Sequence, residues 1–304
     1  MSILLQRSND ALKINPPVGD HHFTVSGSDW LWAVTAIYLF SLLLVVGHSY
    51  IARSGEKIFH YLFTISLFVG TVAYFTIASD LGSTPIKTST GDSGTRQIFY
   101  AKFINWFVGW TPILIAVGLV SGVSWATIIY NIGLSWIWIA SWLSGALVAT
   151  HYKWGFYAFG LLAYFLLVGS LLHTGSITAR RLEIKSSYFL LSSWLAFIWL
   201  LYAIAYGLDD GGNAVSVTSG FIFFGILDVL NVPVIAFAVL FLSRKWDYRS
   251  LNLYFTQYGR VAQGGEFPER EKGVLEPTTN PAPAPAATQA ATPAAASAPK
   301  EETV

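Results

Sequence analysis

The chain contains no cysteine, and this absence removes several kinds of chemistry. It excludes disulfide bonds, thiolate zinc sites and a cysteine nucleophile. Charge is scarce as well: aspartate, glutamate, lysine and arginine make up 12% of the residues, against about 25% in ordinary soluble domains. The formal net charge is +1, and the sequence has no basic stripe that could follow a phosphate backbone. We therefore expect no nucleic-acid partner.

Apolar residues are abundant instead, at 54% of the chain, and they are gathered into long runs. A helix needs about 20 apolar residues to cross the hydrocarbon core of a bilayer, and seven runs approach or exceed that length. We predict transmembrane helices over residues 30–51, 58–80, 97–121, 125–150, 154–172, 188–207 and 215–242. The predicted fold class is an all-α membrane protein, a bundle of seven transmembrane helices.

The chain divides into three predicted regions. Residues 1–29 are polar and lack the apolar core of a cleavable signal peptide, so we expect the first membrane helix to act as the insertion signal. Residues 30–245 form the transmembrane domain. Residues 246–304 form a cytoplasmic tail that is rich in proline and alanine and predicted to be disordered from about residue 266.

Two local features are predicted next to the helices. Ser28 and Asp29 are suited to cap the first helix, because short polar side chains accept hydrogen bonds from free backbone N–H groups. The glycines, proline and threonines of residues 81–96 favour a hairpin or an irregular loop.

The orientation in the membrane is predicted from lysine and arginine in the short loops, which favour the cytoplasmic side. Loops after the first, fifth and seventh predicted helices carry Arg53, Lys57, Arg180, Arg181, Lys185, Arg244, Lys245 and Arg249. The loops on the other side carry Lys87, Arg96 and Lys153. We therefore expect the N-terminus outside the cell and the C-terminus inside.

The seventh predicted helix carries a single carboxylate, Asp228. A carboxylate within a bilayer is costly, so it faces protein or water and marks a site. Two interpretations are open: a relic neutralised by hydrogen bonds from Tyr74 and Tyr202, or part of a working ion or ligand site. Val232 follows four residues later and lies on the same helix face.

Several stretches, in a consistent order, resemble fungal members of the microbial rhodopsin family. They are Tyr100-Ala101-Lys102-Phe103-Ile104-Asn105-Trp106, Ser144-Gly145-Ala146-Leu147, Tyr152-Lys153-Trp154-Gly155, residues 199–213 and Leu227-Asp228. The similarity extends over residues 28–250. It implies a seven-helix bundle of microbial rhodopsin type, in which retinal is bound as a Schiff base to a lysine of the seventh helix.

The residues that carry this chemistry in the family are changed here. The position of the Schiff-base lysine matches Val232, whose isopropyl group cannot form an imine. The carboxylate of the third helix matches Asn105, and the arginine before it matches Lys102. We therefore expect no cofactor, since covalent retinal is ruled out. Lys102 is interpreted either as an interfacial lysine that snorkels to water or as the salt-bridge partner of Asp228.

We assign a set of vestigial retinal-pocket and counterion positions from this resemblance. They are Asp228, Val232, Asn105, Lys102, Trp106, Tyr74, Trp199, Tyr202, Tyr206, Trp138 and Trp142. Trp138 and Trp142 match a region in which the family keeps room for the chromophore ring, and we expect them to fill it as core residues. Asn105 is expected to be a polar contact between helices. One residue more than in the family separates Trp106 from Pro112.

Other polar residues are given structural roles. Asn231 is expected to help satisfy the backbone that Pro233 leaves without a hydrogen bond. Apart from the neighbouring His21 and His22, the histidines do not cluster by spacing, so we expect no metal site. The sequence contains no recognisable pairing of a nucleophile with a base, and we do not expect an enzyme.

The pattern of replacements resembles the opsin-related branch of fungal rhodopsins, which includes the yeast thirty-kilodalton plasma-membrane heat-shock protein. This resemblance implies a stress-associated factor or regulator in the plasma membrane that is not photoactive. We expect it to act through a membrane-protein partner or as a homo-oligomer. Two alternatives remain open, an ion transporter or channel and a photoreceptor that holds retinal non-covalently.

The predicted orientation can be tested with tagged protein in intact cells. A tag after residue 304 should survive protease added to the medium, because the bilayer shields it, whereas a tag before residue 10 should be removed. Permeabilised cells, in which both tags should be lost, are the control, and the measurement is an immunoblot. Loss of the C-terminal tag from sealed cells would reverse the orientation.

Overall fold

The computed structural model describes residues 9–52, 57–88, 94–246, 248, 251 and 253. Within these ranges, seven helical spans are long and apolar enough to cross a membrane, which confirms the predicted seven-helix architecture. The predicted disordered tail lies outside the described residues, as do Arg53 and Arg249.

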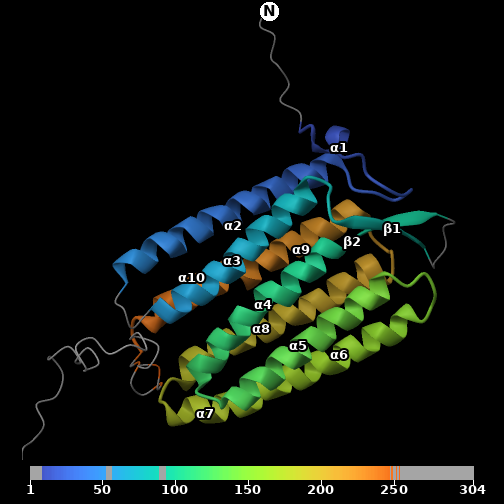
Figure 1. The fold of residues 1–304 in the computed structure, drawn as a ribbon. Helices are drawn as coiled ribbons and strands as arrows, with labels where there is room; N and C mark the ends of the chain where they lie inside the picture. The colour runs from blue at the N-terminus through green and yellow to red at the C-terminus, as the bar shows by residue number, and fades with distance from the viewer. Residues whose placement is uncertain are drawn as a thin grey trace, which may run out of the picture. The chain divides into compact units, whose positions relative to one another are not determined.

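The spans run roughly alongside one another (Figure 1). Their elements are α2 (Val25–Ile51), α3 (Lys57–Ala78), α4 (Tyr100–Ser121), α5 (Trp125–Ala146), α6 (Lys153–Gly169) with the π-helical turn η2 (Ser170–Gly175) and α7 (Ser176–Arg181), α8 (Lys185–Tyr206) with the π-helical turn η3 (Gly207–Gly211), and α9 (Val217–Asn231) with α10 (Pro233–Ser243). A short helix, α1 (Ala11–Ile14), precedes them. Helices α2 to α6 pack in chain order, and α9 packs against both α2 and α8, which closes the bundle.

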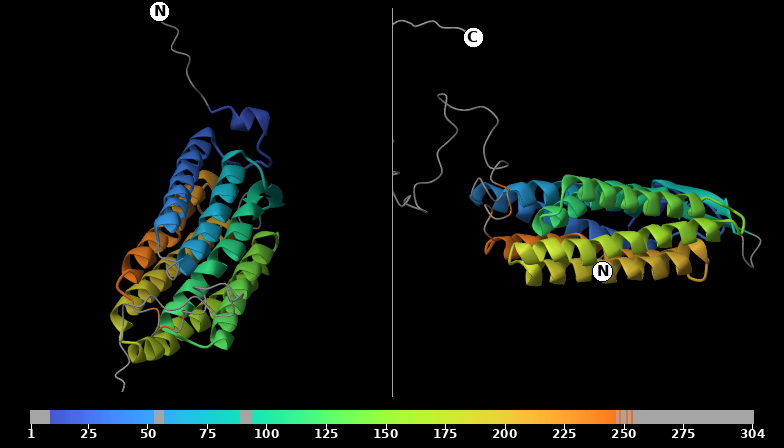
Figure 2. Two further views of the ribbon diagram at one scale, coloured as in Figure 1. Left: turned by 60° about the vertical axis from the view of Figure 1, so that its left-hand side comes forward. Right: turned by 90° about the horizontal axis from the view of Figure 1, so that it is seen from below.

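A small hairpin supplements the helices. β1 (Ser83–Lys87) and β2 (Thr95–Phe99) pair antiparallel, with Ser83 opposite Phe99. It lies at the end of the bundle where α2 and α9 begin, and α7 lies at the opposite end (Figures 1 and 2). The hairpin confirms one of the two forms predicted for residues 81–96.

The side chains divide as expected for a protein that spans a lipid bilayer. The interior is rich in large aromatic groups, and Trp106, Trp138 and Trp199 are fully buried. Large apolar side chains such as Phe40 and Ile129 are more than half exposed on the outside of the bundle, where lipid would surround them. Side chains in the interior and on the outside of the bundle are both largely apolar, and the interior is distinguished by its large aromatic groups.

The first helix begins earlier than predicted, at Val25 rather than residue 30. Its N-cap is Thr24, whose hydroxyl accepts a hydrogen bond from the Gly27 N–H. Ser28, the predicted cap, is buried inside the helix and donates to the Ala78 carbonyl at 2.6 Å. Ser28 therefore joins α2 to α3 and is not available as a cap.

Other predicted boundaries differ for identifiable reasons. Gln97 belongs to β2 and not to the third transmembrane helix, because its amide donates to Asp80 at 2.7 Å and to Ser83 at 3.0 Å. The fifth and sixth helices are longer than predicted because each continues through a π-helical turn. The seventh is interrupted at Val232, since Pro233 cannot donate a backbone hydrogen bond.

One close contact between α5 and α6 depends on a glycine. A Cβ on Gly160 would clash with the indole ring of Trp142 and lie 3.2 Å from Trp138. A Cβ on Gly155, in the same helix, would have nothing within 4 Å. The absence of a side chain at Gly160 therefore allows α6 to approach the buried tryptophans.

We expect Gly160→Val to lower the free energy of unfolding by about 1–3 kcal/mol, because overpacking forces side chains or backbone to move. Gly155→Val is the matched control, since it introduces the same residue into the same helix in open space. The measurement is the thermal midpoint of each variant in detergent. Equal midpoints for the two variants would show that the α5–α6 contact is not tight.

Candidate functional site

The carboxylate of Asp228 lies at the centre of the bundle and is 1% exposed. The hydroxyl groups of Tyr74 and Tyr202 each donate a hydrogen bond to it, as predicted. The indole N–H of Trp106 adds a third donor, 3.1 Å from Oδ1. These donors come from α3, α8 and α4, so four helices meet at one carboxylate.

These contacts satisfy Asp228 with uncharged groups. Burial of a carboxylate is costly unless its oxygens are hydrogen-bonded, and here both oxygens accept from a tyrosine. Tyr38 ties down the same turn of α9, because its hydroxyl donates to the backbone carbonyl of Asp228 at 2.9 Å. The arrangement is held without a cation in contact with the carboxylate among the described residues.

Lys102 is placed differently from either expectation. Its ammonium lies 2.6 Å from Asp210 Oδ2 and 3.2 Å from Asp209 Oδ2, so it pairs with these carboxylates and not with Asp228. It does not snorkel to water, because its side chain is 3% exposed. It also lies over the ring of Phe224, 4.5 Å from the centroid.

Asp209 and Asp210 are site residues that the sequence analysis missed. They were assigned to a loop, but η3 continues the line of α8 and carries both carboxylates into the protein. Arg96 of β2 donates to Asp209, which gives a buried cluster with two cations and two carboxylates together with Lys102. The available signal was the Asp-Asp pair directly after an apolar helix, in a loop predicted to lie on the same side of the membrane as Arg96.

Trp110 is the second residue that was missed. Its indole stacks on Trp106 at a centroid distance of 5.7 Å and on Trp199 at 5.6 Å, with interplanar angles of 26° and 21°. These are contact distances for aromatic rings, so a further flat group cannot lie between them. The available signal was the resemblance, which implies one residue more between Trp106 and Pro112 than in the family.

The prediction that Trp138 and Trp142 are core residues is confirmed, because both are fully buried. Trp138 contacts Trp110 at 5.3 Å, Trp142 at 5.1 Å and Trp199 at 5.9 Å between centroids. Tyr206 stacks on Trp142 at 4.6 Å and donates to its backbone carbonyl at 2.7 Å. Aromatic rings therefore form one continuous packed layer across α4, α5 and α8.

The remaining pocket positions are also packed. Val232 is 3% exposed, and its backbone N–H donates to the Asp228 carbonyl at 2.9 Å. Asn105 is 5% exposed and faces Gly109 of its own helix. Asn231 accepts a hydrogen bond from Trp199 at 3.1 Å through its side-chain carbonyl oxygen. Its Nδ2 has no hydrogen-bond partner among the described residues, so it does not satisfy the backbone near Pro233.

These residues do not fit retinal, the cofactor that the resemblance implies. Attachment requires an amine at residue 232, and a valine side chain has no atom that can form an imine. A bound polyene also requires a flat slot beside that residue, but Trp110 closes the space against Trp199. Both the bond and the space are missing.

Two histidines that are far apart in the sequence lie together in the structure. His48 Nδ1 of α2 lies 2.7 Å from His60 Nε2 of α3, and the rings stack at 4.9 Å. Arg244 donates to the other nitrogen of His48 at 3.0 Å. Spacing could not reveal this pair, because it depends on which turns of two helices face each other. Among the described residues, no three histidines or carboxylates converge as metal ligands.

Comparison with known proteins places this architecture. The model of the bacteriorhodopsin-like protein family matches residues 26–246. Protein FDD123 of Trametes versicolor is 36% identical over 90% of this chain and 97% of its own length. The 30 kDa heat shock protein of Saccharomyces cerevisiae is 35% identical over 75% of this chain and 76% of its own.

A solved structure agrees with these matches. The light-driven proton pump LR (Mac) from Leptosphaeria maculans superposes with a TM-score of 0.71 and is 26% identical, over 76% of this chain and 98% of the pump. Sequence and structure thus agree on one fold, even though the residues at the centre of the bundle no longer suit a chromophore. The chain belongs to the bacteriorhodopsin-like protein family.

Proposed function

We propose that this protein is a non-photoactive, opsin-related factor of the plasma membrane that acts in stress through a partner membrane protein or a second copy of itself. The observation that carries the proposal is the replacement of the chromophore space by packed side chains, with Trp110 stacked between Trp106 and Trp199. Catalysis is not part of this proposal.

The surroundings of the buried ionisable residues support a non-photoactive role. A light-driven pump needs ionisable stations along a path across the bilayer. Asp228 is enclosed by Tyr74, Tyr202 and Trp106, while Asp209 and Asp210 are held in ion pairs at one end of the bundle. The resemblance matches Asn105 to the pump's acceptor carboxylate and implies that the donor carboxylate would fall near Val117. These groups favour a fixed structure over proton movement.

The stress role is supported by relatedness. A relative with 35% identity carries the name 30 kDa heat shock protein. Without a chromophore in the interior, light absorbed there cannot be the stimulus. A signal would therefore reach the protein through contacts on its surface. A role through partners is consistent with a rigid bundle that presents large apolar side chains to the lipid.

The packed centre of the bundle allows a prediction of what happens when retinal is added. Wild type and Val232→Lys should both lack a visible absorption band, because restoring the amine does not open the space that Trp110 fills. Colour should require Val232→Lys combined with Asn105→Asp, Trp110→Thr and smaller residues at 138 and 142. The measurement is the absorption spectrum with all-trans retinal, followed by hydroxylamine bleaching.

Two results would contradict this prediction. A strong, hydroxylamine-sensitive band from Val232→Lys alone would mean that the pocket is open. A band from wild type, or a light-dependent pH change in cells that a strain without the gene lacks, would favour the photoreceptor or transporter alternatives. Trp136→Thr is a matched control for Trp110→Thr, because Trp136 is 40% exposed and should not affect the pocket.

The stress role makes a separate prediction. A strain without the gene should survive heat less well, and wild-type protein should restore survival equally in light and in darkness. Cross-linking in intact membranes should trap a specific adduct, and the yield should change with stress. Survival that depends on illumination, or survival unaffected by loss of the gene, would count against the proposal. The readouts are colony counts and immunoblots of the adduct.

A further inference from the structure

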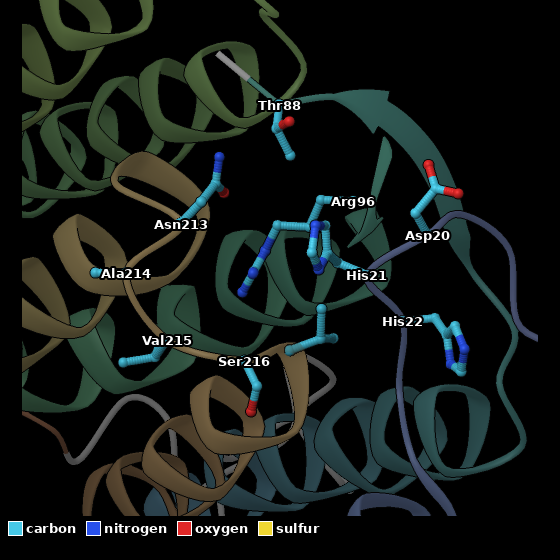
Figure 3. A pocket seen from close by; sticks show the side chains of 10 residues that line it. Asp20, His21, His22, Thr88, Arg96, Asn213, Ala214, Val215 and Ser216 are labelled. Atoms are coloured by element: carbon cyan, nitrogen blue, oxygen red, sulfur yellow. The ribbon is translucent and has the colours of Figure 1, made fainter. Parts of the chain in front are cut away.

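A cleft of about 570 Å³ opens at the end of the bundle that carries the hairpin. Its walls come from the N-terminal segment, the hairpin and the connection between α8 and α9, as Figure 3 shows. A volume of this size lies in the range of small-molecule sites, about 300–1,000 Å³. This cleft is separate from the tryptophan-filled centre described above.

Arg96 supplies the chemistry of this cleft. The residue is 5% exposed and donates through Nη2 to Asp209, but its Nε has no hydrogen-bond partner among the described residues. Figure 3 shows its guanidinium group extending into the middle of the lining residues, between His21 and Ser216. A guanidinium group only donates hydrogen bonds, so the unpaired N–H of Arg96 requires a hydrogen-bond acceptor.

The start of α9 reinforces this preference. Ser216 caps the helix by accepting from the Ser219 N–H at 3.1 Å, and Ser216 and Val217 both line the cleft. The N-terminus of a helix carries a partial positive charge and exposes backbone N–H groups, which together favour an anion. α9 has 15 residues, long enough for this effect.

Among the described residues of the lining, one carries a carboxylate, Asp20, and it does not oppose an anion at Arg96. Hydrogen bonds from the Thr95 backbone N–H and hydroxyl lower the pKa of Asp20 and hold its carboxylate at 2.8 and 3.0 Å. Figure 3 shows this carboxylate pointing away from Arg96. The groups that favour an anion in the cleft are therefore the helix end and the guanidinium group, which also pairs with Asp209.

We propose that this cleft binds a small oxyanion, a carboxylate or a phosphate, with one oxygen accepting from the Arg96 guanidinium group beside the N-terminus of α9. An oxyanion accepts a directional hydrogen bond from a guanidinium N–H, so it suits this donor better than a spherical halide does. The inference does not depend on the function proposed above, since it uses none of the residues at the centre of the bundle.

The test uses the full-length protein in lipid nanodiscs and isothermal titration with sodium acetate, sodium benzoate and sodium phosphate. Sodium chloride at equal ionic strength is the control for screening. We expect saturable binding of at least one oxyanion and none of chloride. Saturable binding of carboxylates alone or of phosphate alone identifies the class of oxyanion that the cleft binds, and either result supports the site.

Three variants locate the binding. Arg96→Gln should weaken it roughly tenfold or more, because a charge-assisted hydrogen bond is lost. Ala214→Trp should block the cleft while leaving Arg96 and Asp209 unchanged, which keeps the test valid if Arg96→Gln does not fold. Asp209→Asn removes the same ion pair but keeps the guanidinium group, so binding should persist.

The proposal is overturned by any of three results. They are the absence of saturable binding by every oxyanion, an affinity for Ala214→Trp within about threefold of wild type, and equal loss of binding in Arg96→Gln and Asp209→Asn. The last result would mean that the ion pair matters only for structure. A thermal midpoint for each variant shows that the titrated protein is folded.

Discussion

The burial of one carboxylate without a cation is the constraint on which the centre of this protein depends. Asp228 lies in a membrane-spanning helix, where an unsatisfied charge is costly. Tyr74, Tyr202 and Trp106 must therefore all point at it, and they come from three different helices. A polar network of this kind specifies how the helices are rotated, because moving any one of them removes a donor from the carboxylate.

The other buried charges follow from the same constraint. The ammonium of Lys102 does not contact Asp228. It lies over the ring of Phe224, and this ring packs against Trp106 with 5.2 Å between the centroids. The ammonium reaches Asp209 and Asp210 instead. The protein thus keeps two separate systems, a carboxylate satisfied by neutral donors and a cluster satisfied by ion pairs. Buried charges of either kind need complete partners, and mixing the systems would leave one incomplete.

Patterns within one helix predicted most of the fold, and contacts between helices account for what was missed. Apolar run length placed all seven spans, and the resemblance implied that Val232 stands at the position of the Schiff-base lysine. The tyrosine donors belonged to one of the two interpretations of Asp228. The pairing of His48 with His60, and of Lys102 with Asp210, depends on the rotation of neighbouring helices, which composition and spacing do not encode. The π-helical turns were not predicted either, because local residue propensities do not distinguish such a turn from a loop.

The packing around Trp110 involves more than one helix. Gly109 meets α3, where the Ser66 hydroxyl donates to its carbonyl at 2.7 Å, and the neighbouring Trp110 stacks on Trp199 of α8. Two consecutive residues of α4 thus hold a contact between helices and a core side chain. Because large aromatic rings from α4, α5 and α8 pack against one another, we expect that a lysine at residue 232 alone would not open the centre.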